Sequence, residues 1–170
     1  MLKNTRLLVL LALFVALDIV LTRVFAITTP MLRVSFGFLP IALSGIMFGP
    51  IAAGLAALVS DLLGATLFGI TPHPGITLTS TLVGVTFGLF LHKNGESLIR
   101  IVLACVVNIG VLSMFVQPIW LAQLTGSPYW GLVLTRLPAL AILFIVQILT
   151  IKIVWTYLAK FFRLTGVLPL

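Results

Sequence analysis

The stretch Leu32–Ala65 reads LRVSFGFLPIALSGIMFGPIAAGLAALVSDLLGA, and we expect the rest of the chain to be arranged around it. This stretch contains the apolar segment Phe36–Phe48 and most of a second one, Ile51–Phe68. The pair Gly49-Pro50 separates the two segments. Because a Gly-Pro pair ends one helix and starts another, the stretch predicts a tight helical hairpin. Asp61 lies inside the second segment, where an ionised carboxylate is costly unless it faces a partner, a cavity or a ligand. The hairpin therefore also predicts a site.

The composition indicates a membrane protein. Of 170 residues 61% are hydrophobic and 8% charged, and the mean hydropathy is +1.31. We expect an all-α membrane protein, a single integral membrane domain over residues 1–170, multi-pass in the cell membrane. The net charge of +7 is spread between apolar runs, which favours membrane topology over a nucleic-acid partner. No phosphate-binding loop occurs, so the chain cannot hydrolyse ATP by itself.

Six apolar segments predict a compact six-transmembrane-helix bundle. Seven of the ten basic residues fall on the side of the two termini, which places both termini in the cytoplasm. The other three, Arg23, Arg33 and Arg136, fall on the outer side, where an anionic ligand would explain them. The expected segments are Thr5–Val24, Phe36–Phe48, Ile51–Phe68, Ile76–Leu91, Leu98–Leu124 and Trp130–Phe162.

Polar side chains collect near the outer ends of these segments and predict a pocket open to the outside. Arginine suits a carboxylate, tryptophan stacks on a flat ring, and aspartate accepts from ring amino groups. A ligand with a flat ring and a negative charge would fit this set. The candidate ligand-binding residues are Arg23, Arg33, Asp61, Pro74, Gly75, Thr77, Gln117, Trp120 and Arg136.

Each feature also has a simpler interpretation. Asp61 could form a structural ion pair with an arginine, and Arg136 could extend its side chain to the lipid boundary. His73 has no second ligand at metal spacing, so neither a metal nor a cofactor is expected. Ala12 and Ala16 form a strip of small residues on the first segment, suited either to docking another helix or to packing inside this bundle.

Four short motifs carry a family resemblance. They are Arg33-Val-Ser-Phe-Gly-Phe-Leu-Pro40, Phe48-Gly-Pro50, Ser60-Asp-Leu-Leu-Gly64 and Pro74-Gly-Ile-Thr-Leu78. Together they resemble the substrate-binding S components of energy-coupling-factor (ECF) vitamin transporters, most closely the folate-specific branch.

The resemblance implies a chain that binds folate or a related vitamin from outside. It implies that Ala12 and Ala16 contact a transmembrane coupling subunit, while two ATPase subunits supply the energy. It also implies toppling, a rotation in the membrane that opens the pocket inward.

Three alternatives stay open at this point. One is an S component for another vitamin, such as pantothenate or a thiamine precursor. Another is an intramembrane enzyme, which would need Asp18 and Asp61 to meet as an aspartyl pair, since no other catalytic motif is present. The last is an accessory subunit without a ligand, for which a filled bundle interior would argue.

Overall fold

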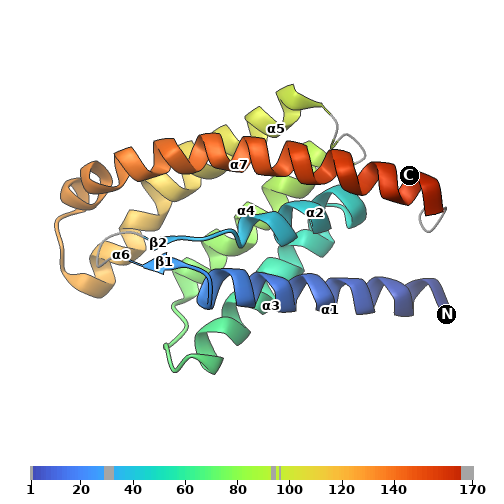
Figure 1. Cartoon of the computed structure of the whole chain (residues 1–170). Coiled ribbons are helices and arrows are strands. Elements are labelled where there is room, and N and C mark those ends of the chain that lie inside the picture. The colour runs from blue at the N-terminus through green and yellow to red at the C-terminus, as the bar shows by residue number, and fades with distance from the viewer. Residues whose placement is uncertain (1, 29–32, 93–94, 96, 166–170) are drawn as a thin grey trace.

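The computed structural model describes residues 2–28, 33–92, 95 and 97–165 (Figure 1). Within these ranges, the side chains of residues 2–4, 6, 27–28, 33–34 and 161–165 lie outside the description. The elements in chain order are α1 (Leu2–Arg23), β1 (Ile27–Thr28), β2 (Arg33–Val34), α2 (Phe38–Phe48), α3 (Pro50–Leu67), α4 (Pro74–Leu91), α5 (Leu98–Cys105), the π-helix η1 (Val106–Val116), α6 (Gln117–Thr125) and α7 (Tyr129–Thr165).

The helices of the described residues form the six predicted segments, because α5, η1 and α6 follow one another without a break. Four of these segments are long and apolar enough to cross a membrane: α3, α4, the span Leu98–Thr125 and α7. The start of α1 and the end of α7 lie at the same end of the bundle (Figure 1). The all-α, six-helix prediction is confirmed.

The predicted hairpin is present as α2 and α3. Gly49 joins them with a φ of +88°, in the region that favours glycine, and Pro50 starts α3. At eleven residues, α2 spans about 16 Å, too little to cross a hydrocarbon core of about 30 Å. Its residues from Pro40 to Ile46 are all buried, so α2 is a core helix inside the bundle.

Small residues let α4 approach this hairpin. A Cβ at Gly88 would collide with the backbone of Pro50, and one at Gly84 would collide with the carbonyl of Ala53. The two glycines therefore serve helix packing, as their spacing of four predicts. This packing holds α3 and α4 side by side and aligns Asp61 with the start of α4.

A short antiparallel ribbon lies toward the end of the bundle opposite the chain ends (Figure 1). In it, Ile27 pairs with Val34 and Thr28 pairs with Arg33. The ribbon follows directly after α1, so it lies beside Arg23, the last residue of that helix.

Candidate functional site

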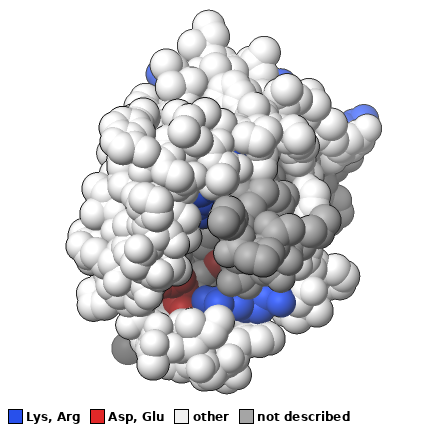
Figure 2. Space-filling model, turned by 90° about the vertical axis from the view of Figure 1, so that its left-hand side faces the viewer, with Lys and Arg blue, Asp and Glu red and all other residues white. Residues whose placement is uncertain are grey.

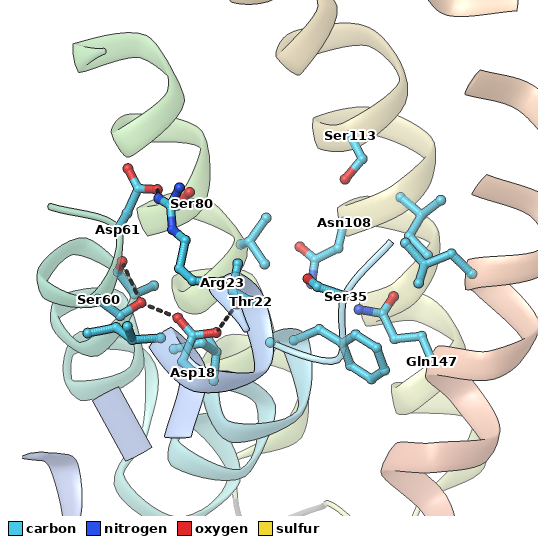
Figure 3. Close-up of a pocket in the computed structure, with 18 residues that line it drawn as sticks. Asp18, Thr22, Arg23, Ser35, Ser60, Asp61, Ser80, Asn108, Ser113 and Gln147 are labelled. Carbon is cyan, nitrogen blue, oxygen red and sulfur yellow. Dashed lines mark hydrogen bonds and ion pairs between the residues drawn. The ribbon is translucent and has the colours of Figure 1, made fainter. Parts of the chain in front are cut away.

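A cavity of about 210 Å³ lies among α1, α2, α3, α4, η1 and α7. Figure 2 shows a hollow on the face away from the chain ends, with acidic and basic side chains meeting in it. Apolar side chains such as Phe38 and Ile41 line the rest. The polar residues of the lining are Asp18, Thr22, Arg23, Ser35, Ser60, Asp61, Ser80, Asn108, Ser113 and Gln147 (Figure 3).

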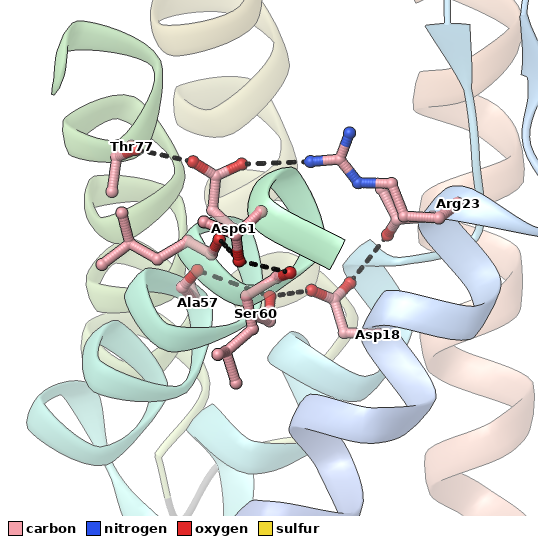
Figure 4. Close-up of polar contacts among 10 residues, drawn as sticks. Asp18, Arg23, Ala57, Ser60, Asp61 and Thr77 are labelled. Carbon is pink, nitrogen blue, oxygen red and sulfur yellow. Dashed lines mark hydrogen bonds and ion pairs between the residues drawn. The ribbon is translucent and has the colours of Figure 1, made fainter. Parts of the chain in front are cut away.

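One wall of the cavity is charged (Figure 4). Asp18 on α1 accepts hydrogen bonds from the hydroxyls of Ser60 on α3 and of Thr22, the latter at 3.0 Å. Asp61 accepts a hydrogen bond from Thr77 at 2.7 Å. The guanidinium of Arg23 lies 4.0 Å from the other oxygen of Asp61. This separation exceeds hydrogen-bonding distance, so the two groups attract each other electrostatically but form no direct hydrogen bond.

The opposite wall is neutral and consists of amides and hydroxyls. Asn108 on η1 and Gln147 on α7 are only 2% and 4% exposed, and both line the cavity. Among the described residues, neither polar atom of the Asn108 amide has a hydrogen-bond partner, and the side-chain oxygen of Gln147 has none either. Buried polar groups in native proteins are normally paired. This wall therefore has hydrogen-bonding capacity that the described residues do not use.

The π-helix explains the composition of the neutral wall. Its hydrogen bonds run from residue i to i+5, so residues five apart come to one face. Asn108 and Ser113 are five apart, and both line the cavity. An α-helical period instead predicts a stripe of Gly110, Ser113 and Gln117, which leaves Asn108 out. For this reason Asn108 is absent from the ligand-binding residues predicted from the sequence. The available signal was an amide within an apolar run.

Of the residues predicted to bind a ligand, Asp61 and Arg23 line the cavity. Pro74 and Thr77 line a second, mostly apolar cavity of about 380 Å³ between α3 and α4. Trp120 donates a hydrogen bond to Thr79 at 3.1 Å and covers Gly75.

Gln117 is partly buried at the start of α6. Neither Gln117 nor Trp120 belongs to the lining of the first cavity.

The other two predicted arginines differ in what the structure describes. Arg136 on α7 is 6% exposed, which confirms that it turns inward and does not extend to lipid. Its Nε and Nη1 atoms are buried and have no hydrogen-bond partner within the described part of the chain. Arg33 has its backbone in β2, but its side chain lies outside the described residues.

The strip of Ala12 and Ala16 lies on the outer surface of α1. Both residues are exposed, whereas Phe14 and Asp18 on the same helix are buried. The interpretation that the two alanines pack inside this bundle is therefore wrong. The strip is available to a partner helix or to lipid.

Comparisons with known proteins agree with this architecture. A family model described as "ECF-type riboflavin transporter, S component" matches residues 2–163. The folate transporter FolT of Clostridium novyi is 36% identical over 154 residues, which cover 90% of each protein. The folate transporter FolT of Leuconostoc mesenteroides is 31% identical over 125 residues, covering 71% of this chain and 66% of that protein.

Two solved structures have similar folds. A crystal structure of FolT bound with folic acid has a TM-score of 0.80 at 31% identity, covering 85% of this chain and 89% of the other. The S component of a bacterial ECF transporter has a TM-score of 0.61 at 25% identity, covering 96% and 97%.

Proposed function

This chain belongs to the family of ECF-type transporter S components, and on that premise we propose that it binds folate from outside the cell and delivers it inward. Members of this family are integral membrane proteins and not enzymes, so the intramembrane-enzyme alternative is rejected. The description of the family model names riboflavin, whereas both folate transporter relatives point to folate.

The main support for folate as the ligand is that this chain has a cavity and shares its fold with a relative solved with folic acid bound. That relative has the same fold over 85% of this chain. Folate joins a flat pterin ring to a tail with two carboxylates. The cavity pairs a neutral amide wall, which suits the ring, with Arg23 at the end of α1, which suits a carboxylate.

Our candidates for the tail are Arg23, which lines the cavity, and Arg136, which is buried but lies outside its lining. Arg23 lies at the end of α1, where the cavity meets the ribbon. Its guanidinium is 4.0 Å from Asp61, a weak contact that a ligand carboxylate could replace. Arg136 is buried, with Nε and Nη1 lacking partners among the described residues, and a buried charge needs a counter-charge. We include Arg33 because its backbone lies in the ribbon beside Arg23.

We propose that the exposed strip of Ala12 and Ala16 docks on a transmembrane coupling subunit. Two ATPase subunits would then supply the energy for toppling. The exposure of both alanines supports a close helix contact at this strip. The absence of a phosphate-binding loop in the sequence agrees with energy from a partner.

Titration calorimetry on the purified, detergent-solubilised protein tests the ligand. We expect folic acid to bind one-to-one with a Kd below micromolar. Riboflavin, pantothenate and thiamine serve as matched competitors. Binding of riboflavin and not of folic acid would overturn the folate assignment while leaving the S-component family in place.

A further inference from the structure

We propose that Asn108 and Gln147 recognise the hydrogen-bonding edge of the ligand's fused ring, and so determine which vitamin the cavity accepts. This rests on the proposed vitamin-binding function and names the part of the site that reads the ring. The two amides come from different segments, η1 and α7, and line the same cavity (Figure 3).

Both amides have hydrogen-bonding capacity that the described residues do not use. Asn108 has a donor and an acceptor without a partner in the described part of the chain, and Gln147 has an acceptor. At 2% and 4% exposure, the two side chains have almost no surface in contact with bulk solvent. An amide buried without hydrogen bonds costs free energy. A ligand that completes these hydrogen bonds removes that cost, and this contributes to its binding free energy.

The charged wall differs from these amides. The carboxylate of Asp18 already accepts from Ser60 and Thr22, and that of Asp61 accepts from Thr77. These hydroxyls use part of the accepting capacity of the two carboxylates, and an ionised carboxylate has no donor to offer. The amides carry both donors and acceptors, and they match an edge on which N–H and C=O groups alternate. Such an edge is found on the pyrimidine portion of a fused heterocycle.

The size of the cavity limits what it can hold. At about 210 Å³ the cavity is smaller than the roughly 300–1,000 Å³ of pockets that enclose drug-sized ligands. It therefore suits one ring system and not a whole vitamin. Asn108 lies well inside the helical span Leu98–Thr125, whereas Arg23 ends α1. This places the ring inside the bundle and the charged tail at the mouth.

The test uses Asn108→Leu and Gln147→Leu, which keep the approximate volume and remove the amides. Exposed Gln123 on α6 supplies the control, Gln123→Leu. We expect each cavity variant to weaken folic acid binding at least tenfold, and the control to change it less than twofold. The apparent Tm without ligand should stay the same or rise, because an unpaired buried amide has been replaced by an apolar group.

Competition with two fragments shows which part of the ligand is read. The inhibition constant of pterin should rise at least tenfold in Asn108→Leu, whereas that of p-aminobenzoylglutamate should change less than threefold. Unchanged pterin binding in both variants would overturn the inference, as would a fall in Tm that accompanies the loss of binding. If the wild-type protein binds riboflavin and not folic acid, the folate proposal fails alone. The same variants must then lose riboflavin for the inference to stand.

Discussion

The hydroxyl of Thr77 donates a hydrogen bond to Oδ2 of Asp61 at 2.7 Å, joining the start of α4 to α3 (Figure 4). The other oxygen of Asp61 lies 4.0 Å from Arg23. Asp61 is thereby held between two elements, and its carboxylate is oriented along the edge of the cavity. The same residue serves the packing of the helices and the charge of the site.

Replacing Thr77 by Val should destabilise the protein by about 1.5–3 kcal/mol, the range for a hydrogen bond to a charged group. The shape is kept, so the loss reports the bond itself. Thermal unfolding in detergent measures it. Thr86→Val is the matched control, because the Thr86 hydroxyl donates to the carbonyl of Leu82 within its own helix, α4. Equal stability of the two variants would contradict the role of Thr77.

Replacing Gly75 by Ala should destabilise the protein by roughly 1–3 kcal/mol, because the new Cβ would collide with the indole of Trp120. Displacing the indole would also break its hydrogen bond to Thr79. Gly110→Ala is the control, since a Cβ there meets no atom within 4 Å. In that open helical position the alanine should be neutral or stabilise by about 1 kcal/mol. A tolerated Gly75→Ala would show that the indole can move aside without cost.

Replacing Arg136 by Met should raise the Tm of the ligand-free protein, because a buried charge whose Nε and Nη1 lack partners among the described residues is removed. If Arg136 binds a ligand carboxylate, folic acid affinity should fall at least tenfold, as a lost charged hydrogen bond of about 1.5–3 kcal/mol requires. Arg100→Met, at an exposed position on α5, should change neither quantity. Wild-type affinity in Arg136→Met would remove this arginine from the site.

Enlarging Ala12 and Ala16 to Leu should leave folic acid binding intact and abolish uptake into cells. The two side chains lie on the outer surface of α1, away from the cavity, so only a partner that approaches closely would be blocked. Ala141→Leu, at an exposed position on α7, is the matched control and should support uptake. Uptake by the double variant would show that the coupling subunit docks elsewhere.

The six helical segments, the break at Gly49-Pro50 and the inward placement of Asp61 could all be predicted from the amino-acid sequence. Each follows from a local rule. Lipid leaves an isolated apolar run no alternative to a helix, a Gly-Pro pair interrupts one, and a charge within such a run turns toward the protein interior. The packing role of Gly84 and Gly88 follows in the same way from their spacing.

Which polar groups share a cavity depends on the packing of distant helices and could not be predicted from the sequence. Asn108 and Gln147 are 39 residues apart and meet because η1 packs on α7. The switch from an α-helical to a π-helical period moves Asn108 onto the face of Ser113, and no local pattern predicts that change. Trp120 is the opposite case, a residue that was predicted to line the pocket and does not. Its position on the fifth segment predicts a pocket residue, but its indole packs on Gly75, outside the lining of the first cavity. Helix identity depends on neighbours in sequence, whereas a cavity depends on how distant helices are rotated against one another.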